Sequence, residues 1–302
     1  MHSAAWNFIS TQAWMLHEPV LRSLGEVVQR HARGDRLDPA VIAAIVSARE
    51  QRRRGSGARI WDDDMGERSV AAKDEPFYEL VGTVAVIPVE GVICKYADMI
   101  NGTSQPRGIT SDRLTRALAA ASVDNRARSI LLQIDSPGGT VAGGDDMLDA
   151  MARTRARKPV VAYCHDLCAS GGYLLASQSS SIYANPSATV GSMGVYCVYQ
   201  DSSKAFADEG ITSIIIRAGV HKGMGEPGVP ISDEQVAAKQ ELVDALAAWY
   251  VDAVAKGRGM IRAAVQTLAT GRVWTGTQAV ELGLVDGVTN ITALLERMNR
   301  AA

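Results

Sequence analysis

The chain has 302 residues, of which 47% are hydrophobic and 21% are charged, and its formal net charge is −2. These values are ordinary for a globular protein of one or two domains. The balanced charge excludes a general electrostatic attraction to nucleic acid or to a membrane surface. No segment has the length and apolarity of a transmembrane helix, and residues 1–34 lack the basic start and continuous apolar core of a signal peptide. We therefore expect no membrane anchor, no nucleic-acid partner and a cytoplasmic location.

The four cysteines do not have the spacing of a metal-ligand set. They are Cys94, Cys164, Cys168 and Cys197. We interpret them as reduced, mostly buried thiols and expect no metal and no cofactor. A cysteine nucleophile is the minority alternative, because no His/Asn partner pattern accompanies any of them.

Three zones follow one another along the chain. Residues 1–48 show amphipathic spacing and predict a helical N-terminal extension. Residues 49–75 combine runs of arginine and aspartate with Gly55-Ser56-Gly57, which predicts a charged flexible linker. A solvated linker explains the arginines better than a nucleic-acid patch does. Residues 76–302 form the third zone, whose pattern is that of a folded domain.

In this third zone, short β-like runs alternate with helical runs, which is typical of an α/β domain. The predicted strands are 84–89, 129–134, 159–163, 181–184, 193–199 and 212–216. The predicted helices are 111–121, 140–155, 170–176, 204–208 and 233–256, followed by two shorter helices and a terminal one at 292–299. Pro88 predicts an edge position or a bulge in the first strand.

Ser170 stands between a predicted strand and a predicted helix, in Ala169-Ser170-Gly171-Gly172-Tyr173. Its small neighbours permit a tight turn and the close approach of a substrate backbone. A nucleophile there would lie at a helix N-terminus, which favours developing negative charge. An N-cap serine is the alternative interpretation, and the local sequence leaves both open.

Lys222 lies in a glycine-rich segment, His221-Lys222-Gly223-Met224-Gly225. A serine hydroxyl needs a neighbouring proton acceptor, and lysine serves as that acceptor in Ser-Lys variants of the catalytic triad. A solvated loop lysine is the commoner role for an isolated Lys. His165 and His221 compete for the role of base, although no carboxylate is placed by the sequence to orient either one.

The segment Asp135-Ser136-Pro137-Gly138-Gly139 ends an apolar run and precedes a predicted helix. Backbone N–H groups in such a turn bind a developing oxyanion in many acyl-transfer enzymes. The N–H groups of Gly139 and Gly171 are the candidates here. A plain strand–turn–helix connection is the alternative.

Several motifs stand together in order along the chain. Besides the three segments already quoted, they include Val190-Gly191-Ser192-Met193-Gly194-Val195, Gly271-Arg272-Val273-Trp274-Thr275-Gly276 and Gly283-Leu284-Val285-Asp286. Over about residues 80 to 290 the chain resembles the signal peptide peptidase A family of Ser-Lys peptidases, which includes phage capsid-assembly (prohead) proteases.

The resemblance implies a Clp-protease/crotonase-like α/β fold of ββα units. It implies that Ser170 is the nucleophile, Lys222 the general base and Ser192 a residue that hydrogen-bonds the lysine. It also implies an oxyanion hole made by the N–H groups of Gly139 and Gly171. Members of the family assemble into rings, so we expect a homo-oligomer.

The phage branch fits best, because a Trp-containing N-terminal segment precedes a charged linker. The expected function is a serine endopeptidase that cuts protein or peptide substrates such as scaffold or capsid proteins, with capsid, portal or scaffold proteins as partners. The expected location of the protein is then the cytoplasm of the bacterial host or the phage prohead. The charged linker, residues 49–75, is a candidate self-cleavage site.

Three alternatives remain at this point. One is a signal-peptide-peptidase-like protein that degrades peptides. Another is a catalytically silent assembly subunit, against which the presence of both Ser170 and Lys222 argues. The last is an acyl-CoA enzyme of the crotonase type, which typically uses carboxylates instead of a Ser-Lys pair.

Overall fold

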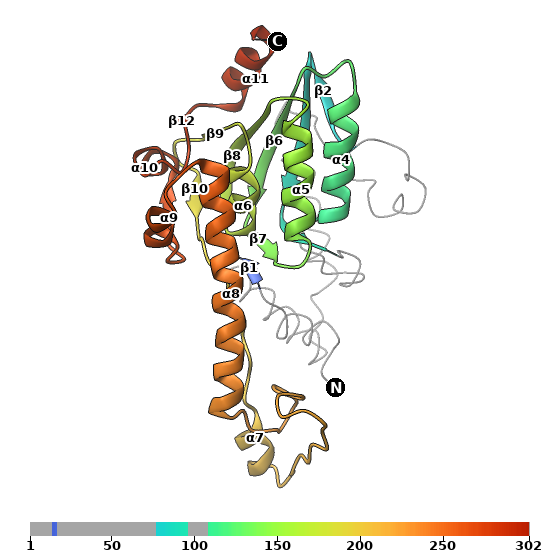
Figure 1. Ribbon diagram of the computed structural model, residues 1–302, viewed down its shortest axis with the longest axis vertical. Coiled ribbons are helices and arrows are strands. Elements are labelled where there is room, and N and C mark those ends of the chain that lie inside the picture. Colours follow the sequence, from blue (N-terminus) through green and yellow to red (C-terminus); the bar gives the residue numbers. More distant parts are fainter. Residues whose placement is uncertain (1–13, 17–76, 96–107, 302) are drawn as a thin grey trace, which may run out of the picture.

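A computed structural model of the chain describes residues 14–16, 77–95 and 108–301 (Figure 1). Its centre is an eight-stranded sheet in which β11, β10, β8, β6, β3 and β2 follow one another, and in which β9 pairs with β8 and β12 with β9. The strands are β2 (Glu79–Val81), β3 (Val84–Glu90), β6 (Ser129–Ser136), β8 (Val160–Ala169), β9 (Ser181–Ala184), β10 (Thr189–Gly191), β11 (Val273–Thr275) and β12 (Gly287–Val288). The neighbours β3, β6, β8 and β10 are parallel, whereas β2 and β11 pair antiparallel at the two edges.

A second, four-stranded sheet continues from the ends of the central strands. Its order is β1 (Trp14–Leu16), β7 (Gly138–Thr140), β4 (Val92–Cys94) and β5 (Gly108–Thr110). Strand β4 follows β3 after one residue, Gly91, whose φ of 72° reverses the chain locally. Strand β7 follows β6 in the same way, through Pro137. Strands β3 and β6 are thus each extended by a short strand before the next helix, which confirms the predicted α/β fold of ββα units.

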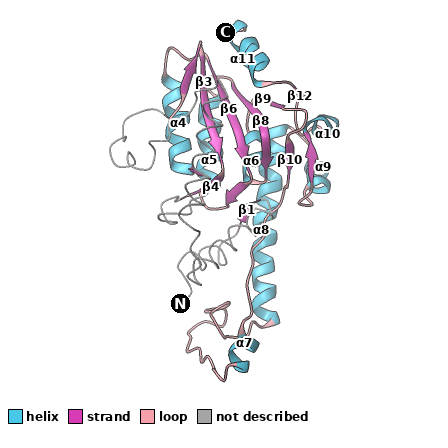
Figure 2. Cartoon of the chain, turned by 180° about the vertical axis from the view of Figure 1, so that it is seen from behind, coloured by secondary structure: helices cyan, strands magenta, loops and turns pink. Residues whose placement is uncertain are grey.

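Helices cover both faces of the large sheet. They are α4 (Ser111–Val123), α5 (Gly144–Arg155), α6 (Gly171–Ser177), α7 (Ser203–Asp208), α8 (Asp233–Arg258), α9 (Arg262–Leu268), α10 (Gly276–Glu281) and α11 (Ile291–Arg300). The main core lies under α4, α5 and α6, where buried side chains such as Leu118, Met151 and Leu174 meet the apolar strands. On the other face, which Figure 2 shows, Leu294 and Met298 of α11 pack on Val84, Val86, Leu131 and Tyr163.

The burial of the strands explains their sequences. Strands β3, β6 and β8 are covered on both faces, so their residues form nearly continuous apolar runs instead of alternating. Strand β2 pairs only with residues 84–86 of β3. Pro88 therefore lies where β3 has β6 as its only neighbour among the described strands, which confirms the expected edge position.

Helix α8 has 26 residues and spans about 39 Å. Its C-terminal half packs on the body through buried Tyr250, Val251 and Val254. Its N-terminal half projects away from the sheets and carries α7 near its tip (Figures 1 and 2). We call residues 200–246 the arm. Several of its apolar side chains are exposed to solvent, among them Ile214 at 83% and Ile216 at 96%.

The structure corrects four predicted elements. Trp14–Leu16 form a strand where a helix was expected, and the helix predicted for residues 140–155 begins at Gly144 because Thr140 belongs to β7. Within residues 192–232, all of which the structure describes, neither predicted strand (193–199 or 212–216) forms. Ser192 has a φ of 50°, which turns the chain off the sheet after β10, and the arm offers no sheet edge to residues 212–216. The remainder of the extension 1–48 and the linker 49–75 lie outside the described residues.

Candidate active site

Ser170 is placed by the junction of strand β8 and helix α6. It is almost fully buried and has φ 51° and ψ −115°, a conformation that L residues adopt rarely. Although it occupies the N-cap position of α6, its side chain makes no capping hydrogen bond. The geometry therefore does not support the alternative interpretation of Ser170 as a helix-capping residue. Backbone strain of this kind is typical of a residue whose side chain must be aimed for a function.

Three hydrogen bonds hold the backbone of Ser170 in this conformation. Its N–H donates to the carbonyl of Gly191 at 2.7 Å. Its carbonyl accepts from the N–H of Leu174 at 2.9 Å and from the hydroxyl of Tyr250 at 2.8 Å. Tyr250 is fully buried, and this burial raises the pKa of its hydroxyl well above the ordinary value, so the group stays a donor. The sequence analysis did not identify Tyr250; a polar aromatic on the apolar face of a long helix was the available signal.

Ser192 lies beside Ser170 at the same end of the sheet. Strands β8 and β10 are parallel, with Ala169 opposite Gly191, so the residue after each strand is Ser170 in one and Ser192 in the other. Ser192 also has a positive φ, of 50°, and its N–H donates to the carbonyl of Arg272 at 2.7 Å. The structure therefore brings these two predicted site residues together.

Gly139 is the centre of strand β7, close to the N-terminus of α6. A Cβ at this position would lie 1.6 Å from the carbonyl oxygen of Ile93, so no larger residue fits. The turn before it is fixed by Ser136, whose hydroxyl donates to the Gly91 carbonyl at 2.6 Å and accepts from the Gly138 N–H at 3.1 Å. A Cβ at Gly172 would lie 3.1 Å from the Ser136 carbonyl oxygen, which shows how closely α6 packs on this turn. The two predicted oxyanion donors, Gly139 and Gly171, thus belong to two segments in direct contact.

Within one chain, Lys222 lies far from Ser170. It is exposed in the loop between α7 and α8, where its N–H donates to the Gly219 carbonyl at 3.1 Å. This loop is tied to the beginning of α8 by a 3.3 Å hydrogen bond from the Gln235 amide to the Val220 carbonyl. Gln235 and the Tyr250 that touches Ser170 are separated by roughly 22 Å of helical rise. One chain therefore does not bring its own Lys222 to its own Ser170.

The histidines that compete as base are also distant from the hydroxyl. His165 precedes Ser170 by five residues of β8, roughly 16 Å of extended strand, and its Nδ1 lies 3.3 Å from Asp166. Strand β8 bulges against β6 between these points, where the Leu167 N–H donates to Asp135 at 3.1 Å. Burial raises the pKa of Asp135, which acts here as a backbone acceptor. His221 is exposed in the arm next to Lys222.

The buried cysteines do not compete with Ser170 as nucleophiles. All four are free thiols, and three of them are buried. Burial raises the pKa of Cys94 to about 11 and that of Cys168 well above its ordinary value, which disfavours the reactive thiolate. Among the described residues, no group of three or more His, Cys, Asp or Glu side chains is placed to hold a metal ion.

A strained serine at a strand-to-helix junction, glycine amides beside it and stacked ββα units define the Clp-type class of serine peptidase folds. Residues 95–190 match the Clp protease family model, and residues 152–302 match the model of peptidase family S49. This chain belongs to peptidase family S49. The family predicted from the ordered motifs is thereby confirmed.

Individual relatives come from phages and from cellular organisms. Over 240 residues the chain is 30% identical to capsid assembly protease C of Escherichia phage lambda, covering 79% of this chain and 53% of the relative. It is 32% identical over 225 residues to head-tail preconnector protein GP5 of Enterobacteria phage P21, covering 74% and 44%. It is 34% identical over 166 residues to an Enterococcus faecium protein named for the signal peptide peptidase SppA, covering 55% and 48%.

The chain thus spans about half the length of these curated relatives. Among the helices that the structure describes, none combines the length and the apolarity needed to cross a bilayer.

Proposed function

We propose that this chain is a serine endopeptidase with Ser170 as its nucleophile. The observation that carries the proposal is the conformation of Ser170, which is strained, held by three hydrogen bonds to its backbone groups and without a side-chain capping bond. Such a serine fits an acyl-transfer mechanism. The N–H groups of Gly139 and Gly171 are the proposed donors to the oxyanion that forms on the scissile carbonyl.

Lys222 is the proposed general base, and we infer that a second copy of the chain supplies it. A base must come within hydrogen-bond distance of the hydroxyl. In the single chain, however, the Lys222 loop is tied to the far end of α8, roughly 22 Å of helical rise from Tyr250. An ammonium group must also be removed from water to become a neutral base, and Lys222 is exposed in the single chain. Packing of one copy's arm on another copy's site would meet both requirements. The exposed Ile211, Ile214 and Ile216 of the arm supply apolar surface for such packing.

The proposed reaction has two stages. The Ser170 Oγ attacks the peptide carbonyl carbon while Lys222 accepts the hydroxyl proton, and Ser192, next to Ser170, orients the ammonium group. Lys222 then gives the proton to the leaving amine as the C–N bond breaks, leaving an ester on Ser170. Water hydrolyses this ester, again with Lys222 as the proton acceptor, and restores the serine.

The proposed role is processing of scaffold or capsid proteins during phage head maturation, in the bacterial host cytoplasm or in the prohead. The names of the lambda and P21 relatives, which refer to capsid assembly and to a head-tail preconnector, support this role. The SppA-named relative supports the alternative of a peptidase that degrades peptides. Capsid, portal or scaffold proteins are the proposed partners, besides further copies of the chain.

Labelling with a serine-reactive fluorophosphonate tests the proposal. The wild type should be labelled at Ser170, and Ser170→Ala should lose the label. Lys222→Ala should also lose it, whereas Lys204→Ala, which removes another exposed lysine of the arm, should keep it. Equal labelling of the wild type and Ser170→Ala would reject Ser170 as nucleophile. A wild-type oligomer that is never labelled would favour a catalytically silent assembly subunit.

A further inference from the structure

Strand β1 pairs with the edge of β7 that carries the proposed oxyanion donor. The pairing is antiparallel, with Trp14 opposite Thr140, Met15 opposite Gly139 and Leu16 opposite Gly138. The other edge of β7 is taken by β4 through Ile93. Figure 1 shows β1 beside β7, below α6, although the two strands are far apart in the sequence. A segment near the N-terminus therefore completes the sheet next to the site.

The direction of the Gly139 amide follows from its neighbour. The carbonyl of Ile93 faces β7, because its oxygen lies 1.6 Å from where a Cβ on Gly139 would stand. In the parallel pair of Ile93 and Gly139, a carbonyl that faces the partner strand accepts from the residue after its partner, so the Thr140 N–H points toward β4. Consecutive residues of a strand direct their N–H and C=O groups to opposite edges, and the groups of Gly139 therefore point toward β1. In an antiparallel pair, the residue directly opposite such a position exchanges both hydrogen bonds with it. Met15 is that residue, and its carbonyl is placed on the Gly139 N–H.

A substrate needs this same donor. Extended peptides bind free sheet edges by adding an antiparallel strand, and an attacked carbonyl must reach the oxyanion donor. With Met15 opposite Gly139, the strand Trp14–Leu16 holds the edge in the register of a peptide whose Met15 carbonyl would be attacked. This step rests on the proposed function, because Gly139 is an oxyanion donor only if the chain is a peptidase.

We propose that Trp14–Leu16 is an intramolecular peptide ligand of the substrate-binding edge, which an incoming peptide must displace. The strand has three residues and few backbone hydrogen bonds, so it is weak as a separate ligand. Because it belongs to the same chain, its binding is intramolecular and does not depend on the protein concentration. It acts as a built-in competitive inhibitor that raises the apparent KM for peptides.

Hydrogen exchange of the full chain tests this proposal without requiring activity. The measurement uses Ser170→Ala and compares Met15→Pro with Met15→Leu in that background. Proline lacks the N–H that donates to the Gly139 carbonyl, whereas leucine keeps the backbone bonds and a similar side-chain volume. Exchange in the peptide that contains Gly138–Thr140 should become at least about tenfold faster in Met15→Pro and stay unchanged in Met15→Leu. Unchanged exchange in Met15→Pro would overturn the proposal.

A synthetic peptide with the sequence of residues 10–20 supplies the second measurement. Added in excess to Ser170→Ala/Met15→Pro, it should restore slow exchange at Gly138–Thr140, and failure to do so would contradict binding at this edge. In the active chain, Met15→Pro should lower KM for a fluorogenic peptide with kcat unchanged. If no variant hydrolyses peptides but exchange responds as described, the proposed function fails while occupation of the edge stands.

Discussion

The hydroxyl of Tyr250 donates a 2.8 Å hydrogen bond to the carbonyl of Ser170, across 80 residues of sequence. Tyr250 lies on the buried half of α8, and the other half belongs to the arm. The loop that carries Lys222 is tied to the N-terminal end of that other half, far from Tyr250. The same helix therefore fixes the proposed nucleophile of its own chain and extends the proposed base away from it. In a ring of such chains, each α8 would connect one active site to the next.

The first prediction concerns this connection. Ser170→Ala and Lys222→Ala should each be inactive alone, and a mixture assembled from the two should regain activity. If each site takes its serine from one copy and its lysine from another, roughly a quarter of the sites in an equimolar mixture will be intact. Peptide hydrolysis after co-refolding or subunit exchange measures this. A mixture as inactive as its two components would show that both residues act within one chain.

The second prediction concerns Tyr250 as a positioning residue. Tyr250→Phe removes one of two donors to the Ser170 carbonyl and should cost about 1 kcal/mol of unfolding free energy. Because the strained turn then relaxes, kcat should fall roughly tenfold while KM stays nearly constant. Tyr173→Phe is the matched control: its buried hydroxyl donates to the Leu284 carbonyl at 2.8 Å, away from Ser170. It should show the same loss of stability with kcat retained, and equal kcat losses in both variants would refute the positioning role.

The third prediction concerns Gly139. Gly139→Ala would drive a methyl group into the Ile93 carbonyl oxygen, so β7 must separate from β4. We expect a loss of more than about 3 kcal/mol in unfolding free energy together with loss of fluorophosphonate labelling. Gly210→Ala is the comparison, because its φ is 73° but no atom lies within 4 Å of the added Cβ. It should cost only about 1 kcal/mol and keep the label. Chemical denaturation of both variants measures the difference.

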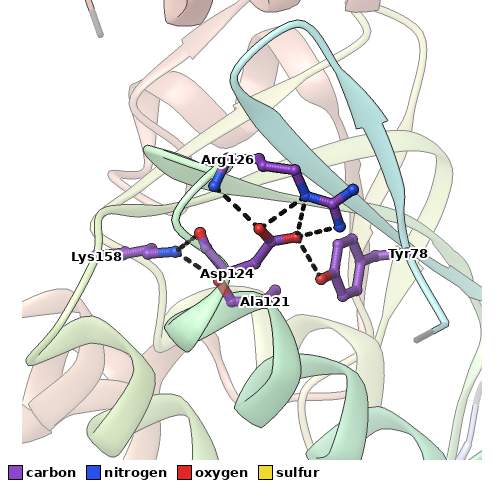
Figure 3. A network of polar contacts seen from close by, with 5 residues as sticks. All are labelled: Tyr78, Ala121, Asp124, Arg126 and Lys158. Carbon is purple, nitrogen blue, oxygen red and sulfur yellow. Dashed lines mark hydrogen bonds and ion pairs between the residues drawn. The ribbon is translucent and has the colours of Figure 1, made fainter. Parts of the chain in front are cut away.

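The fourth prediction concerns acid stability and the end of α4, shown in Figure 3. Asp124 accepts hydrogen bonds from the side chain and backbone N–H of Arg126 and from the Tyr78 hydroxyl at 2.8 Å, and these hold its pKa well below its usual range. In the unfolded chain the carboxyl binds its proton near pH 3.9. Folding stability should therefore fall as the pH drops through about 4, because only the unfolded state gains this proton.

Denaturation midpoints between pH 6 and pH 3 test this expectation. Asp124→Asn should lower stability at pH 6 and flatten the dependence on pH, whereas Tyr78→Phe should flatten it only partly because the Arg126 contacts remain. The hydrogen bonds of Lys158 should persist in both variants, since its ammonium group donates to the backbone carbonyls of Ala121 and Asp124 at 2.7 and 2.6 Å. An Asp124→Asn protein with the wild-type slope would contradict the assignment.

The sequence by itself determined the fold class and the family, because the relevant signals are local. Apolar runs mark the strands that are covered on both faces, and the glycine-rich segments around Gly139 and Ser170 mark turns whose conformations depend on a few adjacent residues. The capping box at Ser232 and Gln235 likewise made the start of α8 predictable.

Tertiary structure decided what depends on pairing between distant segments. Residues 212–216 have a β-forming composition but lie on an arm with no sheet edge to pair with, and Trp14–Leu16 become a strand because β7 offers one. The bond from Tyr250 to Ser170 and the separation of Lys222 from Ser170 arise from the path of a long helix. Local propensity carries no information on where a helix leads, so only the folded chain shows how far the proposed base lies from the proposed nucleophile.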